Sequence, residues 1–488
     1  MNYSITLKIV GYILIIESIF MLPALLFSYV INDGAFNSFV VTIIGMIILG
    51  LICKEQETKK TKVTPRDGLL VVSVAWIVAS IFGAIPLYIS RSLPTYIDAF
   101  FEIVSGFTTT GASVVQNIEI LPKSIVLWRS ITHWVGGMGI LVFTISLLPK
   151  LGVAGFQMFK AESPGPVTGK IEPKLSSTAK RLYIIYIIIT ITLFILLWIC
   201  GMTPYDSIVH TLGVVGTGGF SSKANSVGFY NNGTGLNLIS IIMGIFMFMC
   251  GVNFSNYYLV YKGKIRTVLR DEEFKTYAGI IVFSTVVIAI DLFFNKYGGI
   301  LKSISDSFFQ VTSISSTSGF SNVDYDVWPS FSKYVLYILM FLGSCAGSTA
   351  GGMKIVRLVV MYKLIKREIV KVIHPKAVIP IKLNNKILND EVVLGITSYM
   401  VVYIILLVVC SGIVTISGID IISATSAVVT MLSNVGPGFL AVGPSKNFFF
   451  FSDGYKLLFC FLMLLGRLEF FTLLALLAPR STRRKEVV

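Results

Sequence analysis

Charged residues are scarce in this chain. Only 13% of its 488 residues are Asp, Glu, Lys or Arg, against about 25% in a typical soluble domain. Hydrophobic residues make up 55%, and the mean hydropathy is +0.81. This composition excludes an ordinary soluble domain and indicates a protein that lives in a membrane.

Residues that bind metals or form disulfides are also few. The three histidines, His133, His210 and His374, have no metal-ligand spacing. The six cysteines are isolated, mostly within apolar runs: Cys53, Cys200, Cys250, Cys345, Cys410 and Cys460. This pattern argues against metal or disulfide chemistry. The glycine-rich stretch 213–219 resembles a phosphate-binding loop only in composition, because no helix with a correctly placed lysine follows it. We therefore expect neither enzymatic activity nor a covalent cofactor.

Long apolar runs are abundant instead. Runs of roughly 17 to 25 residues suffice to cross a hydrocarbon layer about 30 Å thick. The first run carries Lys8 and superficially suits a secretory signal, but it is too long and has no A-x-A-like cleavage site, so we interpret it as a retained helix. Ten spans are predicted, near residues 5–29, 36–53, 69–90, 125–148, 182–201, 236–261, 277–294, 334–361, 392–416 and 455–478.

The distribution of basic residues predicts the orientation. Of 40 Lys and Arg residues, 28 lie in alternate connections between the spans, and only nine lie in the opposite connections. By the positive-inside rule, the basic loops and both termini are cytoplasmic. The net charge of +15 then reflects membrane orientation and lipid headgroups, and we expect no nucleic-acid partner. The basic connections are 54–66, 149–181, 262–275, 357–386 and 480–485.

Four short segments between the long spans each end in a Thr or Asn two residues before a glycine. Because the flanking spans already account for the crossings, each short segment must enter and leave on the outer side. Ten helical residues reach about 15 Å, half the hydrocarbon thickness. The predicted re-entrant segments are Asp98–Phe107, Asp206–Val215, Asp306–Ser316 and Asp420–Leu432.

The four segments also agree position by position. Thirteen residues before the glycine stand residues that we predict to cap the start of each helix: Asp98, Asp206, Asp306 and Ser423. Six residues before it stand small residues that allow close helix packing: Ser105, Gly213, Ser313 and Thr430.

The chemistry of such segments favours an ion pathway. Non-helical backbone at membrane depth must line a water-filled or ion-filled cavity, because lipid offers its peptide groups no partner. Glycine lets carbonyls point at one axis without an obstructing side chain, and four such strands would replace the water shell of a monovalent cation. The predicted filter is Thr109, Thr110, Gly111, Thr217, Gly218, Gly219, Thr317, Ser318, Gly319, Asn434, Val435 and Gly436.

This arrangement resembles the TrkH family of bacterial and archaeal potassium transporters, within the superfamily that includes KtrB and the plant and fungal high-affinity potassium transporters. The likeness runs from about residue 67 to the C-terminus, and the two helices before Arg66 resemble the extra N-terminal pair of TrkH. The stretches that carry it are 105–112, 134–139, 218–221, 318–321, 347–354 and 432–438.

The resemblance implies an all-α membrane protein with two N-terminal transmembrane helices and four helix–pore-loop–helix repeats around a central ion pathway. The corresponding units are an N-terminal two-helix extension at 1–66 and pore repeats at 67–181, 182–275, 276–390 and 391–488, the third with a broken second helix.

The implied function is potassium uptake across the cell membrane. Gly111 supports potassium, since some plant sodium transporters of the superfamily have serine there. The resemblance also implies a homodimer that docks a cytoplasmic TrkA-type ring, and we expect ATP, ADP or NAD only on that separate subunit. The alternative is a cation-coupled secondary carrier, such as a K⁺/H⁺ or K⁺/Na⁺ symporter or an alternating-access solute transporter. Such a carrier predicts inverted repeats, whereas these four share one orientation.

Two features predict a gate, which the resemblance to TrkH implies lies below the filter. Residues 343–352 are ten small residues, four of them glycine, within an apolar span, and each glycine weakens a helix by about 1 kcal/mol. Close helix packing is the alternative interpretation. Arg467 lies inside the apolar run Leu457–Leu477, where it should face protein or water. It is either half of a structural ion pair or, as the resemblance supports, a positive charge that limits cation flow. The predicted gate comprises Gly343, Ala346, Gly347, Ser348, Thr349, Ala350, Gly351, Gly352, Lys354 and Arg467.

Overall fold

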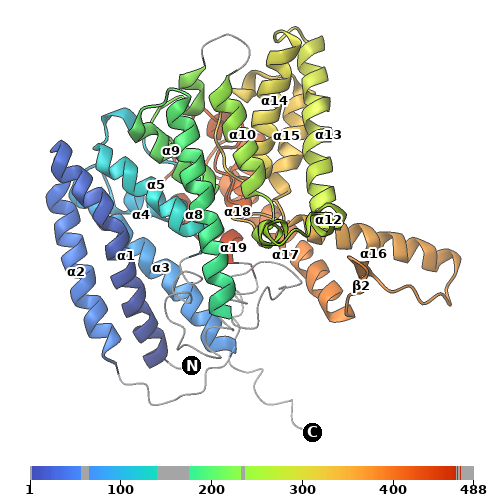
Figure 1. The fold of residues 1–488 in the computed structure, drawn as a ribbon, viewed down its shortest axis with the longest axis horizontal. Coiled ribbons are helices and arrows are strands. Elements are labelled where there is room, and N and C mark those ends of the chain that lie inside the picture. Colours follow the sequence, from blue (N-terminus) through green and yellow to red (C-terminus); the bar gives the residue numbers. More distant parts are fainter. Residues whose placement is uncertain are drawn as a thin grey trace.

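The computed structural model describes residues 3–56, 65–139, 175–231, 237–468, 470 and 473 (Figure 1). Within these residues the chain is nearly all helical, and its two strands form one short hairpin of Lys382–Leu383 (β1) and Lys386–Ile387 (β2). The expected all-α class is confirmed.

The helices follow a repeated order. A leading pair is followed by four groups, each with a long helix, a short helix and a third helix. The leading pair is α1 (Tyr3–Ile31) and α2 (Phe36–Lys54). The groups are α3 (Pro65–Ile89), α4 (Tyr96–Phe107) and α5 (Lys123–Gly137); α8 (Leu175–Ile199), α9 (Pro204–Gly216) and α10 (Leu238–Cys250); α13 (Glu272–Phe294), α14 (Ile300–Ser315) and α15 (Ser330–Phe341); and α17 (Asp390–Thr415), α18 (Ile421–Ser433) and α19 (Asp453–Leu468).

The remaining helices are connections. Helices α11 (Phe254–Tyr261), α12 (Ile265–Arg270) and α16 (Ile355–Ile373) join the groups, and α16 extends sideways from the bundle (Figure 1). Single 3₁₀ turns follow the short helices at Ile118–Ile120, Ser226–Tyr230, Tyr325–Val327 and Leu440–Val442.

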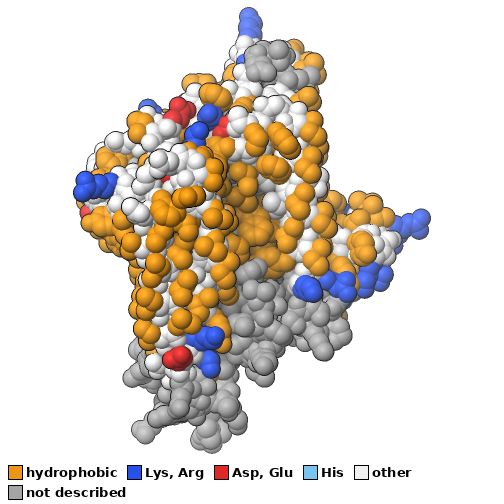
Figure 2. Space-filling model, turned by 60° about the vertical axis from the view of Figure 1, so that its left-hand side comes forward, with side chains coloured by type: hydrophobic (Ala, Val, Ile, Leu, Met, Phe, Trp, Pro, Cys, Tyr) orange, Lys and Arg blue, Asp and Glu red, His pale blue; other side chains and the backbone are white. Residues whose placement is uncertain are grey.

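Six of the described helices are long and apolar enough to cross a membrane: α1, α2, α3, α8, α13 and α17. Their outward side chains, such as Ile44, Ile188, Val282 and Ile404, are exposed. Figure 2 shows hydrophobic side chains over most of one described face, with charged side chains toward its upper and lower ends. This surface suits lipid, and the predicted membrane class is confirmed.

Two predicted spans are not single straight helices. The span near 236–261 bends by 92° between α10 and α11, because the chain turns at Gly251 and Asn253 then caps α11 by accepting a hydrogen bond from the Ser255 amide (2.8 Å). The span near 334–361 is interrupted between Phe341 and Ile355. The predicted spans near 125–148 and 455–478 run partly outside the described residues.

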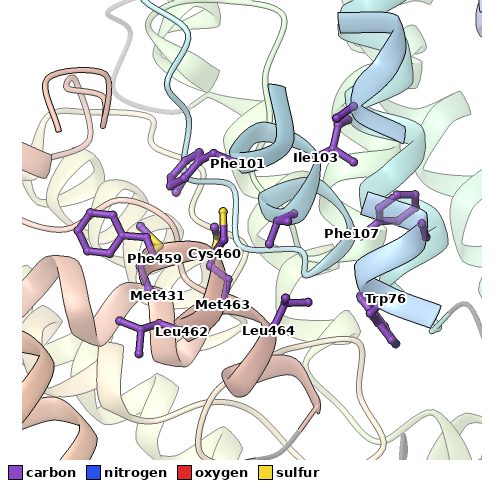
Figure 3. Close-up of a cluster of buried hydrophobic side chains, with 14 of the residues drawn as sticks. Trp76, Phe101, Ile103, Phe107, Met431, Phe459, Cys460, Leu462, Met463 and Leu464 are labelled. Carbon is purple, nitrogen blue, oxygen red and sulfur yellow. The ribbon is translucent and has the colours of Figure 1, made fainter. Parts of the chain in front are cut away.

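The four groups contact one another in a closed order. Each short helix packs against the third helix of the preceding group: α9 against α5, α14 against α10, and α18 against α15. The order closes because α4 of the first group packs against α19 of the last. Figure 3 shows this junction, where Phe101 and Phe107 of α4 lie in the same buried cluster as Phe459 and Leu462 of α19. The short helices are therefore held at the centre.

In three of the short helices, the residue that caps the helix start lies three positions before the predicted one. The cap of α4 is Thr95, whose hydroxyl accepts a hydrogen bond from the Asp98 amide (3.1 Å) and donates one to the Asp98 carboxylate (2.9 Å). Thr203 and Asp206 repeat this arrangement in α9. The predicted capping role of these aspartates is wrong, because they occupy the third helical position of a reciprocal capping pair.

The other two short helices also correct the prediction. Asp420, not Ser423, caps α18 and accepts hydrogen bonds from the amide and hydroxyl of Ser423 (2.8 and 2.5 Å). In α14 the helix starts earlier, with Gly299 as its cap, so Asp306 lies inside the helix and accepts a hydrogen bond from the Asn322 side-chain amide (2.8 Å).

A buried ion pair fastens α19 to α4. The Lys456 ammonium lies 2.6 Å from the Asp98 carboxylate, and both side chains are almost fully buried. Removing one partner leaves the other charge buried and uncompensated, so we expect Lys456→Met to lower the free energy of unfolding by about 3 to 5 kcal/mol. The midpoint of thermal unfolding of purified protein in detergent measures this loss. Lys264→Met, at an exposed position, is the matched control, and equal midpoints for the two variants would contradict the assignment.

Candidate ion pathway

The backbone makes the same turn at the end of all four short helices. The residue two before each glycine is left-handed, with φ of 56°, 57°, 56° and 54° at Thr109, Thr217, Thr317 and Asn434. The glycines also have positive φ, of 79°, 82°, 71° and 94° at Gly111, Gly219, Gly319 and Gly436. Positive φ at a β-branched threonine costs about 1 to 3 kcal/mol and is found mainly where surrounding structure and function impose it.

Equivalent hydrogen bonds fix these turns. The amides of Thr110, Gly218, Ser318 and Val435 donate to the carbonyls of Ser105, Gly213, Ser313 and Thr430 at 2.9, 2.8, 2.8 and 2.9 Å. Together with the left-handed residue, this bond defines a Schellman helix end. The small residues picked out by sequence therefore contribute their carbonyls to ending the helix. At Gly213 the small residue also allows the predicted close packing, because a Cβ there would lie 2.8 Å from Cζ of Phe320.

The four triplets touch one another in a ring. A Cβ at Gly111 would lie 2.1 Å from the Gly218 carbonyl oxygen of the second group. The corresponding distances are 2.2 Å from Gly219 to the Ser318 oxygen and 2.2 Å from Gly319 to the Val435 oxygen. The ring closes at Gly436, whose Cβ would lie 2.5 Å from the Thr110 oxygen of the first group. Each glycine is thus required because a carbonyl of the next segment occupies the place of its side chain.

A cavity opens onto this ring. Its volume is about 240 Å³, and its lining includes all four glycines: Gly111, Gly219, Gly319 and Gly436. Hydroxyl-bearing residues that follow the glycines, Ser113, Ser221 and Ser321, also line it. The arrangement is a vestibule with room for several water molecules that leads to a ring of backbone oxygens.

The residues predicted as the gate lie directly against the triplets. The Gly351 amide donates to the Thr317 hydroxyl (2.8 Å), and a Cβ at Gly351 would lie 2.7 Å from Cβ of Asn434. The side-chain amide of Asn434 in turn donates to the Thr110 hydroxyl (3.0 Å). The predicted filter and the predicted gate therefore share hydrogen bonds.

Residues 343–352 form an ordered non-helical loop with several anchors. The Gly343 amide donates to the Met353 carbonyl (2.8 Å), which closes the base of the loop. The carbonyl of Gly347 accepts from the Phe254 amide (2.9 Å), and the Cys345 amide donates to the Gly251 carbonyl (3.0 Å). The bend between α10 and α11 thus supports the loop.

Glu273 of α13 is a further anchor that sequence reasoning missed. One carboxylate oxygen accepts from the amides of Ala346 (2.7 Å) and Val356 (3.1 Å), so Glu273 joins the loop to the start of α16. Its side chain is buried. The available signal was the acidic run Asp271–Glu273 at the start of a membrane span, where a buried acid requires a partner.

Both predicted gate cations bind loop carbonyls. The buried Lys354 ammonium donates to the carbonyl oxygens of Ala350 and Gly351. The Arg467 guanidinium donates to the Thr349 carbonyl (2.8 Å) and the Thr109 hydroxyl (3.1 Å). It also reaches the carbonyls of Gly136 (2.6 Å) and Gly137 (2.9 Å). Arg467 therefore joins the fourth group to the first and third just below the ring.

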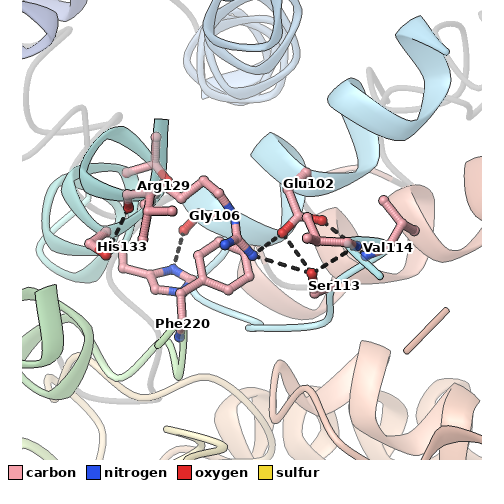
Figure 4. Close-up of polar contacts among 11 residues, drawn as sticks. Glu102, Gly106, Ser113, Val114, Arg129, His133 and Phe220 are labelled. Carbon is pink, nitrogen blue, oxygen red and sulfur yellow. Dashed lines mark hydrogen bonds and ion pairs between the residues drawn. The ribbon is translucent and has the colours of Figure 1, made fainter. Parts of the chain in front are cut away.

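A second buried network lies behind the first and second triplets (Figure 4). Glu102 of α4 pairs with Arg129 of α5 and accepts hydrogen bonds from the Ser113 hydroxyl (2.9 Å) and the Val114 amide (3.0 Å). The Arg129 guanidinium stacks 3.9 Å from the ring centre of Phe220. Glu102 thus fixes the non-helical segment that follows Gly111, through Ser113 and Val114.

His133, which has no metal-ligand spacing in the sequence, joins the same network. Its Nδ1 lies 2.8 Å from the Gly106 carbonyl, and its Nε2 accepts from the Phe220 amide (3.2 Å). These two contacts assign the tautomer with hydrogen on Nδ1. The pairings of Glu102 with Arg129 and of His133 with Gly106 and Phe220 join residues 27 or more positions apart, and no local sequence pattern predicts them.

Comparison with known proteins places these features in a family. The family model TrkH, described as "Cation transport protein", matches residues 35–483. Among curated relatives, the Trk system potassium uptake protein TrkH of Escherichia coli (strain K12) is 35% identical over 99% of this chain and 100% of its own length. TrkG of the same organism is 31% identical over 96% of each chain.

A solved structure is similar over the same extent. The crystal structure of the potassium transporter TrkH from Vibrio parahaemolyticus superposes with a TM-score of 0.87 at 33% identity. The match covers 98% of this chain and 99% of that chain.

Proposed function

The chain belongs to the TrkH family of cation transport proteins, and on this premise we propose that it takes up potassium ions across the cell membrane. Relatives that match nearly its whole length are named as potassium uptake proteins. The observation that carries the proposal is the ring of four glycines, in which each Cα lies against a carbonyl of the next segment.

In this proposal the ring is the selectivity filter. A potassium ion enters the vestibule, loses its water shell and passes between the four triplets, whose backbone oxygens take the place of water. The close contacts between neighbouring segments support a fixed ring size, because no segment can move inward without colliding with the next carbonyl.

The loop 343–352 acts as the gate below the filter, with Lys354 and Arg467 as its fixed charges. Its hydrogen bond to Thr317, and its link through Arg467 to Thr109, support this role because both join it to residues of the proposed filter. A unit charge about 4 Å from a permeating cation opposes it by about 4 kcal/mol at an effective dielectric constant of about 20. Moving the loop and the charge together would open the path.

The proposed unit boundaries, membrane orientation and partners are those predicted from the sequence. The unit boundaries are 1–66, 67–181, 182–275, 276–390 and 391–488, with both termini cytoplasmic. The chain works as a homodimer, and a cytoplasmic TrkA-type ring that binds nucleotide regulates it through the basic inner loops. Potassium is the transported ion rather than a resident cofactor.

Replacing a filter glycine with serine tests the proposed filter. A Cβ at Gly111 or Gly319 meets a neighbouring carbonyl at 2.1 or 2.2 Å, so the ring must widen or distort. We expect the K⁺/Na⁺ preference of uptake into proteoliposomes to fall about tenfold, equivalent to about 1.4 kcal/mol. Gly279→Ser, at a helical position where a Cβ would have no neighbour within 4 Å, is the control. An unchanged preference in both filter variants would overturn the assignment.

Variants of the loop and of Arg467 test the proposed gate. Deleting Ser348–Ala350 should remove the obstruction, and Arg467→Ala should remove the opposing charge. We expect K⁺ flux per folded protein to rise about tenfold or more in each, because about 1.4 kcal/mol off the barrier gives that factor. Arg270→Ala, at an exposed position, is the control. If flux falls in both variants, these residues are structural supports and not a gate.

A further inference from the structure

Glu17 is a buried acid in the middle of the first membrane helix. It lies in α1 between Ile16 and Ser18, and only 5% of its surface is exposed. Neither of its carboxyl oxygens has a hydrogen-bond partner in the described structure. Nothing in the proposed filter or gate uses this residue. An acid at this depth with no partner requires a physical explanation.

The surroundings of Glu17 are apolar. The residue borders a cavity of about 10 Å³, which is about the smallest volume that holds one water molecule. A water molecule there would need two or more polar partners, and a metal cation would need several oxygen ligands, whereas Glu17 is the only polar residue in the lining. The other residues that line the cavity are Ile13, Ile16, Phe20, Ala79, Phe107, Trp128 and Val135.

The other ionisable groups on the packed helices have different partners. Glu102 of α4 pairs with Arg129 of α5 (Figure 4). Lys54 of α2 lies over the ring of Tyr12, 5.6 Å from its centre. Asp67 lies in the first turn of α3. It is about 24 Å along the helix from Gly83, the residue of α3 that lies next to Glu17.

Five more groups belong to this set. Asp98 of α4 pairs with Lys456, and Lys123 at the start of α5 lies over the ring of Tyr205. Lys8 lies nine residues before Glu17 in the sequence, or about 13 Å along α1. His133 of α5 binds Gly106 and Phe220. Arg467 approaches α3 at Trp76, 6.0 Å from the ring centre, but it donates hydrogen bonds to Thr109, Thr349, Gly136 and Gly137. A charged Glu17 carboxylate would therefore have no counter-ion among the described residues and no other polar side chain in its cavity to solvate it.

Glu17 also lies next to the helix that leads into the first filter segment. A Cβ at Gly83 of α3 would lie 2.9 Å from the Glu17 Oε1 and 3.1 Å from the Phe107 ring. Phe107 is the last residue of α4 and precedes Thr108–Gly111 directly. Its carbonyl oxygen would lie only 1.9 Å from a Cβ at Gly136, so this helix end has no room to move. Any change of volume or charge at Glu17 acts on the first filter segment.

We propose that Glu17 is a proton-binding site inside the membrane, occupied at neutral pH, and that this acid is therefore the site at which a hydrophobic carbodiimide modifies the protein. A bound proton neutralises the Glu17 carboxylate, whose negative charge the apolar cavity cannot solvate. The cavity lies near the outer surface of α1, because Ile16 and Phe20, which line it, are only partly buried. A lipid-soluble reagent therefore reaches Glu17, whereas a water-soluble one does not.

The modification requires the protonated acid. The acid proton moves to one nitrogen of dicyclohexylcarbodiimide while a carboxyl oxygen bonds to its central carbon, which gives an O-acylisourea. Transfer of the acyl group to the neighbouring nitrogen then gives a stable N-acylurea, and no group leaves. The bulky adduct would press on Phe107 and distort the first filter segment, so cation uptake should fall.

The test treats the full chain in liposomes with dicyclohexylcarbodiimide or with a water-soluble carbodiimide at neutral pH. Mass spectrometry maps the adducts and isotope flux measures uptake. We expect an adduct on Glu17 with the lipid-soluble reagent alone, together with loss of uptake. Glu17→Gln should keep basal uptake and lose both the adduct and the inhibition.

Infrared spectroscopy of the untreated wild-type protein gives a second readout that needs no variant. The carbonyl band of a protonated carboxylic acid should be present at neutral pH and absent from Glu17→Gln. An unmodified Glu17, or equal modification by the water-soluble reagent, would overturn the proton site, as would an infrared spectrum without the band. An adduct at Glu17 without loss of uptake would refute its link to the filter.

Discussion

The structure depends on the close approach of four backbone segments around one axis. At each segment a glycine Cα lies against the carbonyl of the next segment, and the fourth contacts the first. No side chain fits at any of the four positions, so the chain must supply glycine there and must bring each segment to the same depth. The buried short helices and their common Schellman ends serve this requirement.

The elements around the ring restrain it from two sides. Glu102, Arg129 and His133 fix the strand beyond Gly111 and connect it to Phe220 of the next segment. Below the ring, Arg467, Lys354 and Glu273 bind the loop 343–352 through its backbone. These are all charged or polar groups in a membrane interior, where burial is costly unless each finds a partner. Much of the buried charge among the described residues is therefore concentrated around the proposed pathway.

The sequence predicted the class and the positions of the short helices well, because long apolar runs and glycine-ended segments are local patterns. The starts of these helices differ from the prediction, because Thr95 and Thr203, not Asp98 and Asp206, cap α4 and α9. The bend at Gly251 was also missed, since an apolar run does not show whether its helix is straight. Contacts such as Glu102 with Arg129, or Glu273 with Ala346, depend on tertiary packing and leave no periodic signal.

The central claim is that a potassium ion binds within the ring of carbonyls next to the four glycines. The most direct measurement is a crystal or cryo-electron microscopy structure of the protein with thallium or rubidium in place of potassium. We predict an ion on the axis, within coordination distance of the backbone oxygens of Thr110, Gly218, Ser318 and Val435. A well-resolved ring without ion density under saturating salt, or ion density only elsewhere, would contradict this claim.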